Sequence, residues 1–249
     1  MIREERFEYI LAMLTKNERV EYDTVARNLQ VSDDTVRRDI EMLHQSGLLS
    51  KVRGGAISRS KNPLSFQQRK SYLTKGKDTI ALKAQQLIKK GQTIIMDGGT
   101  TNCAIACHFP INTSIRVITN NQALIPVLSA YPSIDIVVLG GEYDRSTETV
   151  YGAYACNEVR KYAADLYLMG TCAIDHRFGI TAAVSTDGEL KQAMLQSSKH
   201  TVVISNQEKL NTADHYKVCD LDRVETLITD LPSDHKKLDP YRARGFRIM

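Results

Sequence analysis

The chain has 249 residues and a net charge of +4, with 42% hydrophobic and 25% charged residues. These values are ordinary for a globular protein with one large or two modest domains, and no apolar run approaches the ~20 residues that a membrane-spanning helix needs. The first residues, Met1-Ile2-Arg3-Glu4-Glu5, are too acidic for a signal peptide, so we expect a cytoplasmic protein with no membrane partner.

The five cysteines are scattered and form no Cys-x-x-Cys pair, so neither a disulfide framework nor a zinc ribbon is indicated. Cys103, Cys107 and His108 come closest to a ligand cluster. Cysteines four residues apart in an expected helix are more often small core residues than metal ligands. We therefore predict no metal and no cofactor.

Three helices are expected in the first 45 residues. Their apolar repeats are Phe7, Ile10, Leu11 and Leu14 in the first, Val25, Ala26 and Leu29 in the second, and Val36, Ile40 and Leu43 in the third. Ser32 stands at the start of the third helix, where serine caps a helix well. Two short helices joined by a tight connection form a helix-turn-helix motif, whose second helix enters the DNA major groove.

A β-prone run over Leu48–Val52 follows the third helix and meets a compact turn at Arg53-Gly54-Gly55-Ala56, which is typical of a wing. The residues placed to contact DNA lie in the first turns of the third helix and in this wing. They are Ser32, Asp34, Thr35, Arg37, Arg38, Lys51, Arg53 and Gly54. The alternative is a helical hairpin whose charges face solvent, because helix-turn-helix patterns are degenerate.

The run from Ser32 to Ile40, followed by Arg53-Gly54-Gly55-Ala56, resembles the signature of the DeoR family of bacterial transcription regulators. The resemblance implies that residues 3–58 form a winged helix-turn-helix domain that binds double-stranded operator DNA. The first 60 residues carry ten basic and ten acidic side chains, so this prediction depends on their placement rather than on bulk charge. Residues 61–90 carry eight basic and one acidic side chain, which we interpret as a solvated linker and helix surface.

Residues 59–74 lose periodicity and gather Ser, Asn and Pro, which predicts a linker. A helix is expected over Lys75–Lys90. Beyond it, six short apolar runs predict strands at residues 93–96, 115–118, 134–139, 165–169, 201–204 and 224–228. Most are separated by segments long enough for a helix, so residues 75–249 are expected to form a mostly parallel α/β sensor domain with both faces of its sheet covered.

Ligands of such sheets bind where the strands end, so the loops after the strands carry the candidate ligand residues. These are Asp97, Gly98, Gly99, Thr100 and Thr101 after the first strand, Thr119 and Asn120 after the second, and Gly140 and Gly141 after the third. Glycines, hydroxyls and a helix N-terminus suit a phosphate group. A plain strand-to-helix turn is the alternative, and the Gly-Lys-Ser/Thr element of a nucleotide-hydrolysing loop is absent.

These loops, with Gly152, Asp165 and Asp230, occur in the order found in the DeoR-type sensor domain, which is similar to the ribose-5-phosphate isomerase fold. The resemblance implies a phosphorylated sugar as ligand and adds Glu189 and Lys209 to the candidate ligand residues. The family commonly has Asp three residues before this lysine and Gly two residues after it. Here those positions are Asn206 and Asn211.

A sugar-phosphate isomerase is the alternative function. By resemblance, such an enzyme has acidic residues directly after the fourth strand, where this chain has Met169-Gly-Thr-Cys172. Because isomerisation needs a carboxylate base helped by further acids, we predict no catalysis. We expect instead a repressor of carbohydrate-metabolism genes, relieved by a phosphorylated sugar. We expect it to be a dimer or tetramer, because one winged helix-turn-helix domain, here called the reading head, contacts few base pairs.

Overall fold

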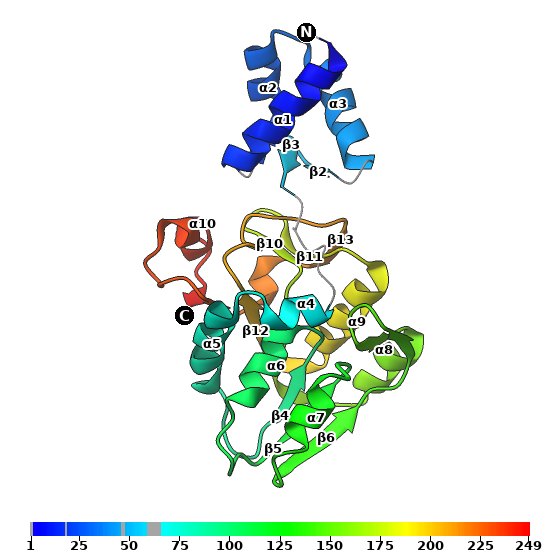
Figure 1. The fold of residues 1–249 in the computed structure, drawn as a ribbon, viewed down its shortest axis with the longest axis vertical. Coiled ribbons are helices and arrows are strands. Elements are labelled where there is room, and N and C mark those ends of the chain that lie inside the picture. The colour runs from blue at the N-terminus through cyan, green and yellow to red at the C-terminus, as the bar shows by residue number, and fades with distance from the viewer. Residues whose placement is uncertain (1, 18, 46–47, 59–65) are drawn as a thin grey trace.

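The computed structural model describes residues 2–17, 19–45, 48–58 and 66–249. Figure 1 shows a small N-terminal domain of helices and short strands at one end and a larger domain built around a sheet at the other. The predicted order of a winged helix-turn-helix domain followed by an α/β domain is confirmed. Among the described residues, no helix is both long enough and apolar enough to cross a membrane.

The N-terminal domain contains three helices and an antiparallel sheet in the order β1-β3-β2. Its elements are α1 (Arg3–Asn17), β1 (Arg19–Glu21), α2 (Tyr22–Leu29), α3 (Asp33–Gln45), β2 (Ser50–Val52) and β3 (Gly55–Ile57). The predicted apolar faces meet in the core, where Ile10, Val25 and Ile40 are fully buried. The sequence did not predict β1, because three residues are too few to show a strand period.

An ion pair between α1 and α3 orients these two helices. The Arg6 guanidinium donates from Nε to Asp39 Oδ2 at 2.6 Å and from Nη2 to Asp39 Oδ1 at 2.9 Å. Asp39 is buried although it lies on the helix that was expected to read DNA. A two-pronged contact of this kind fixes the angle between two helices more tightly than apolar packing alone.

Part of the linker predicted for residues 59–74 is helical. Residues 59–65 lie outside the described residues, but Phe66–Ser71 forms the helix α4. The Phe66 side chain is buried against α5 and α6, and its backbone N–H donates to the Ser146 carbonyl at 3.1 Å. Phe66 therefore anchors this end of the predicted linker to the sensor domain.

Seven strands form a fully parallel sheet in the order β15-β14-β12-β9-β4-β5-β6. They are β4 (Thr93–Met96), β5 (Ile115–Thr119), β6 (Ile134–Val138), β9 (Ala164–Gly170), β12 (Ser198–Ser205), β14 (Thr226–Thr229) and β15 (Arg247–Ile248). Six of them coincide with the predicted apolar runs, which confirms the parallel sheet. Strand β15 escaped prediction because it has only two residues.

Helices cover both faces of this sheet. One layer holds α5 (Thr74–Gln85), α6 (Thr100–Cys107) and α7 (Leu124–Leu128), and the other holds α8 (Ala153–Val159), α9 (Ser185–Gln196) and α10 (Asp239–Arg242). Short 3-10 turns lie at η1 (Leu221–Arg223) and η2 (Lys236–Leu238). Successive residues of β4 alternate between the layers, since Ile94 packs in the first and Ile95 in the second.

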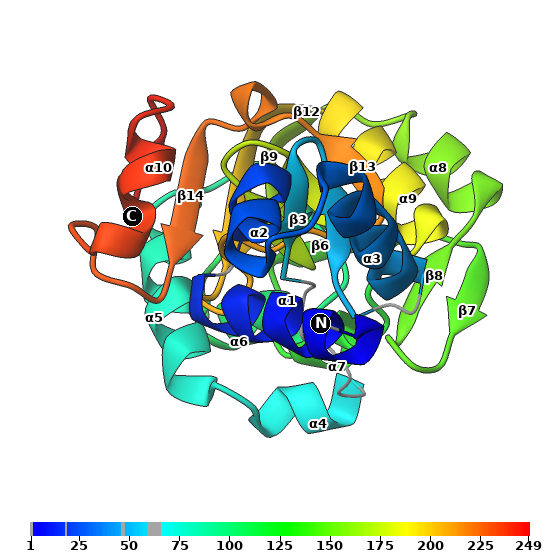
Figure 2. The ribbon, with the colours of Figure 1, turned by 90° about the horizontal axis from the view of Figure 1, so that it is seen from above.

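Two small antiparallel sheets complete the sensor domain. One pairs β7 (Glu142–Asp144) with β8 (Thr149–Tyr151), and the other has the order β10-β11-β13, formed by β10 (Ala173–Asp175), β11 (Gly179–Ala182) and β13 (Tyr216–Cys219). Figure 1 shows the second sheet at the end of the sensor domain that faces the N-terminal domain. Figure 2 shows the β7–β8 hairpin at an outer edge of the molecule.

We expect Asp39→Ala to destabilise the N-terminal domain by about 3 kcal/mol, because it leaves the Arg6 guanidinium without its partner in a mostly buried place. Asp33→Ala, at an exposed position on the same helix, is the matched control and should change stability by less than about 0.5 kcal/mol. Urea unfolding of the full chain followed by circular dichroism measures both. Equal midpoints for the two variants would contradict the structural role of this pair.

Candidate DNA-reading face and ligand site

The recognition helix α3 begins directly after Ser32, which caps it as predicted. The backbone N–H of Thr35 donates to Ser32 Oγ at 3.2 Å, and the two hydroxyl oxygens lie 2.9 Å apart. This cap satisfies one of the free N–H groups of the first turn. It also holds both hydroxyls at the end of the helix that would enter a DNA groove.

The outer side of α3 presents the predicted polar residues to solvent. Asp34, Arg37 and Arg38 are exposed, whereas Val36 and Ile40 are fully buried. Residues four apart lie on one helical face, so Asp34 and Arg38 share the side opposite the core. Arg37 lies about 100° away from Arg38 around the helix, on the side of the wing.

A groove of about 550 Å³ runs between the recognition helix and the wing. It is lined by Tyr22, Arg37, Glu41, His44, Lys51, Val52, Arg53 and Gly54. The Arg37 guanidinium lies 4.6 Å from the centroid of the Tyr22 ring, and Lys51 Nζ lies 2.5 Å from Glu41 Oε2. Gly54 has a φ of +89°, which lets the wing turn sharply. Cationic groups therefore stand on both walls of the groove, where DNA phosphates would meet them.

In the sensor domain, the Asp97 carboxylate at the end of β4 is the centre of a buried polar cluster. It is 1% exposed. Its Oδ2 accepts hydrogen bonds from the Tyr167 hydroxyl at 2.7 Å and from Lys191 Nζ at 2.5 Å. Its Oδ1 accepts hydrogen bonds from the Gly170 N–H at 2.8 Å and from Asn102 Nδ2 at 2.9 Å. Since four donors occupy both oxygens, Asp97 anchors the loop and has no acceptor position left for a ligand.

The loop after Asp97 presents free donors at the start of α6. Gly99 has a φ of +121°, which an L side chain rarely adopts. A Cβ on Gly98 would lie 2.6 Å from the Thr149 methyl carbon, so both glycines are required by the shape of the loop. Within the described part of the chain, the hydroxyls of Thr100 and Thr101 form no hydrogen bond. They lie beside the N-terminus of α6, where the sequence predicts that a phosphate group binds.

Thr119 and Asn120 support the site from β5. The Thr119 hydroxyl donates to the Met96 carbonyl at 2.6 Å, and Asn120 Nδ2 donates to the Val150 carbonyl at 2.9 Å. Both side chains are buried, so they tie neighbouring segments together. Asn120 Oδ1 is a buried acceptor with no partner among the described residues, and so is Asn206 Oδ1 at the end of β12. Buried acceptors of this kind are commonly satisfied by water or a ligand.

Gly140 and Gly141 have a packing explanation. A Cβ on Gly140 would lie 2.8 Å from the Tyr154 ring, and one on Gly141 would lie 2.2 Å from the Tyr151 carbonyl oxygen. The Gly140 N–H donates to Glu158 Oε2 at 2.8 Å. The contacts of this turn are therefore with β8 and α8, and they account for both glycines without a ligand.

The structure does not bring Glu189 to the cluster. Glu189 is exposed on α9, while Asp187 and Lys191, which are four residues apart, share the inner face of that helix. A residue two positions along a helix points about 200° away, so Glu189 and Lys191 cannot both face the site. Asp187 lies 3.7 Å from Lys191 Nζ and 3.7 Å from the Cys172 sulfur. Although burial opposes the charged amine, the Asp187 and Asp97 carboxylates raise the pKa of Lys191.

Further cations lie close to Lys209, beside the cluster. Lys209 Nζ donates to the Thr171 carbonyl, and burial lowers the pKa of its amine, with Arg69 and Lys191 acting in the same direction. Lys77 Nζ donates to the carbonyls of Arg69 and Tyr72. Burial, and next to it the charges of Lys209 and Arg69, lower the pKa of Lys77 to about 8.

Lys77, Arg69 and Lys191 were not among the candidate ligand residues predicted from the sequence. A signal for Lys77 was present, because it precedes Ile80 and Ala81 by three and four residues and so lies on the apolar face of α5. A lysine on a buried face calls for an acceptor or an anion. Among the described residues, no group of three or more His, Cys, Asp or Glu side chains is arranged to hold a metal ion.

Two family models match this chain. The DeoR-like helix-turn-helix domain matches residues 6–62, and the DeoR C terminal sensor domain matches residues 73–231. Over 232 residues the chain is 33% identical to the HTH-type transcriptional repressor GlcR of Bacillus subtilis (strain 168), covering 92% of this chain and 89% of that protein. Over 235 residues it is 32% identical to the lactose phosphotransferase system repressor of Lactococcus lactis subsp. lactis, covering 92% of each.

Among solved structures, the ribose 5-phosphate isomerase A of Methanocaldococcus jannaschii aligns with a TM-score of 0.39 and 16% identity. The alignment covers 54% of this chain and 53% of that one.

We expect Asp97→Ala to destabilise the sensor domain by about 3–5 kcal/mol, because Lys191 keeps its buried charge without its closest partner. The double variant Asp97→Ala with Lys191→Met should recover part of this loss, since it removes both charges. Urea unfolding of the single and double variants gives the coupling between them. Additive losses would show that the two groups do not depend on each other.

Proposed function

Since this chain belongs to the DeoR family of DNA-binding transcription regulators, we propose that it represses genes of carbohydrate metabolism until a phosphorylated sugar binds its sensor domain. Proteins similar to it include repressors named for glycerol-3-phosphate and for a lactose phosphotransferase system, which supports a sugar-linked role. The family consists of regulators rather than enzymes. The buried Asp97 carboxylate fits this, because four donors prevent it from acting as a base.

The observation that carries the choice of ligand is the excess of positive charge around Lys77 and Lys209. Lys77 and Lys209 donate to backbone carbonyls, and neither forms an ion pair with a carboxylate among the described residues. Burial and the charges of Lys209 and Arg69 lower the pKa of Lys77, and burial with the charges of Arg69 and Lys191 lowers the pKa of Lys209, which supports a site where cations repel one another. A phosphate dianion would relieve this repulsion and accept hydrogen bonds from the Thr100 and Thr101 hydroxyls.

We propose further that two or more copies act together on DNA. A single recognition helix contacts few base pairs, and a dimer that binds two half-sites about one helical turn apart multiplies its affinity. Each copy would place Arg38 over base edges and Arg37, Lys51 and Arg53 beside phosphates. Sedimentation of the full chain gives the number of copies, and a monomer at the concentration that binds DNA would contradict this part of the proposal.

Arg37→Ala should weaken binding to all DNA sequences alike and reduce the salt slope by about 1, because Arg37 faces the wing and would contact a phosphate. Arg38→Ala should relax preference at one base position at a cost of about 1–3 kcal/mol. The measurement is a salt-titrated gel shift on DNA that the parent selects from a random pool. Arg116→Ala, an exposed arginine in the sensor domain, is the control. If both reading-head variants bind like this control, the recognition helix is wrongly assigned.

Ligand affinity should fall as pH rises above about 8, by up to about tenfold per pH unit. Lys77 loses its proton there, whereas a phosphomonoester is already a dianion. Lys77→Met should weaken binding and flatten this pH dependence, and Thr100→Val with Thr101→Val should weaken binding more than tenfold. Calorimetry with a panel of sugar phosphates measures these affinities.

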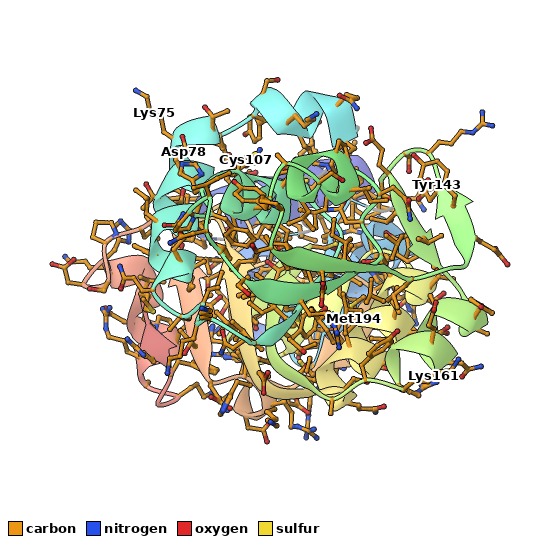
Figure 3. All side chains as sticks on the ribbon, turned by 90° about the horizontal axis from the view of Figure 1, so that it is seen from below. Lys75, Asp78, Cys107, Tyr143, Lys161 and Met194 are labelled. Carbon is orange, nitrogen blue, oxygen red and sulfur yellow. The ribbon has the colours of Figure 1, made fainter. Side chains whose placement is uncertain are left out.

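Lys75→Met is the matched control for Lys77→Met, because Lys75 lies on the same helix and projects from the surface (Figure 3). It should leave both the affinity and its pH dependence unchanged. Binding of a neutral sugar with the same affinity as its phosphate would contradict the proposed anion site.

A further inference from the structure

The base of the wing sheet rests on the sensor domain. In the sheet register, Ile57 of β3 pairs with Arg19 of β1 on one side and with Ser50 of β2 on the other, so these residues form one row across the sheet. Figure 1 shows this end of the sheet directed at the sensor domain. The two outer residues of the row, Arg19 and Ser50, both bond to that domain.

Arg19 makes the stronger of the two contacts. Its Nη2 lies 2.9 Å and 3.0 Å from the two carboxylate oxygens of Asp175 in β10, and its guanidinium lies 5.6 Å from the Phe178 ring centroid. The Asp175 side chain is 1% exposed, and that of Arg19 is 18% exposed. Asp175 also accepts the backbone N–H groups of Arg177 and Phe178, so the turn between β10 and β11 holds the carboxylate in place.

Ser50 makes the second contact, at the other end of the row. Its hydroxyl donates to the Ala213 carbonyl at 2.5 Å, and the Ala213 N–H donates to the Ser58 carbonyl at 3.4 Å. Beside it, the rings of His44 on α3 and His215 pack edge to face with centroids 4.8 Å apart. The reading head is thus held at two points, one on the β10–β11 turn and one on the segment before β13.

Each of these two contacts with the reading head lies four residues along the chain from a residue of the ligand site. Thr171 leads through β10 to Asp175, and Lys209 leads to Ala213. The two segments are bonded to each other, because the Ile174 N–H donates to the Lys209 carbonyl and the Thr212 N–H donates to the Ile174 carbonyl. At the ligand end, the Lys209 amine closes the connection by donating to the Thr171 carbonyl.

We propose that Arg19 and Asp175 are a positioning pair, which fixes the reading head on the sensor domain when no ligand is bound. An anion at the ligand site draws the Lys209 amine away from the Thr171 carbonyl and thereby loosens the pair. This inference rests on the proposed function, because it takes its trigger from the phosphorylated ligand.

The charges around Lys209 indicate how its amine responds when an anion binds. Lys209 lies close to the cations Lys77, Arg69 and Lys191, so an anion bound among them attracts its amine more strongly than a neutral carbonyl does. Losing that bond frees Thr171, from which β10 runs directly to Asp175. Since Asp175 can hold Arg19 only while its turn keeps its shape, the reading head gains freedom when the ligand binds. Two heads that are no longer held at a fixed angle meet two half-sites less often.

The chain contains no tryptophan, so Phe178→Trp places a single indole beside Arg19 as a reporter of this contact. In the reporter background we compare the parent with Arg19→Gln. Arg177→Gln is the matched control, because Arg177 lies in the same turn but pairs only at the surface, with Glu21 at 3.6 Å. The probes are D-glucose 6-phosphate and inorganic phosphate, and the thermal midpoint is recorded in parallel.

Without ligand, Arg19→Gln should shift the indole emission to longer wavelength, and Arg177→Gln should not. The sugar phosphate should shift the parent in the same direction and leave Arg19→Gln nearly unchanged, while raising the thermal midpoint of both. On selected DNA, the ratio of affinities without and with ligand should fall toward one in Arg19→Gln. A purely structural contact would not change this ratio.

If Arg19→Gln and the parent have the same emission, the pair does not hold the reading head and the inference is wrong. If ligand raises the midpoint but leaves the parent emission unchanged, the coupling is wrong and the proposed function stands. If neither probe raises the midpoint, the proposed ligand class fails, and the inference fails with it.

Discussion

The hydrogen bonds to the Asp97 carboxylate are the interaction on which the ligand end of the sensor domain depends. They join the end of β4 to β9 through Tyr167 and Gly170, to α6 through Asn102 and to α9 through Lys191. A carboxylate can remain charged at this depth only with such partners. Because it is held from three directions, the following loop keeps the shape that Gly98 and Gly99 permit. The N–H groups at the start of α6 therefore point to a fixed place.

Because Asp97 neutralises Lys191, the uncompensated positive charge of the site lies on other lysines. Lys191 has its carboxylates, but Lys77 and Lys209 have only carbonyl oxygens as acceptors among the described residues. Lys77 is buried and Lys209 is partly buried, so solvent screens their repulsion only weakly. The loop after β9 consists of Thr171 and Cys172 and carries no acidic side chain to cancel that excess. With Cys172 in that loop the excess remains, and the site is suited to hold an anion rather than to move a proton.

The sequence predicted the elements that have a strong period. The three helices of the reading head and six strands of the parallel sheet follow from apolar spacing, and the Ser32 cap follows from residue type. The φ of +60° at Asn211 is consistent with the family preference for glycine there, since asparagine is among the few residues that adopt this conformation readily. Strands of three residues, such as β1 and β10, are too short to show an alternation of apolar and polar residues, so the sequence could not predict them.

The candidate site was predictable only in part, for a different reason. Positions on one loop, such as Thr100 and Thr101, are neighbours in sequence and in space. Lys77, Lys191 and Lys209 come from three distant segments, and only the folded sheet brings them together. The resemblance indicated Glu189 by its position in an enzyme, whereas the helical phase of α9 directs Asp187 and Lys191 toward the cluster.

The distance between ligand and DNA limits how a small molecule can control this protein. A ligand shifts an equilibrium only by its differential affinity for two arrangements, so the contact it breaks must belong to one of them. The Lys209 amine meets this condition, because it bonds to the Thr171 carbonyl only while no anion competes for it. The segments from Thr171 to Asp175 and from Lys209 to Ala213 are short and bonded to each other. A change at one end is therefore passed toward Arg19 and Ser50 along these two segments, whose Ile174 and Leu210 belong to the apolar core.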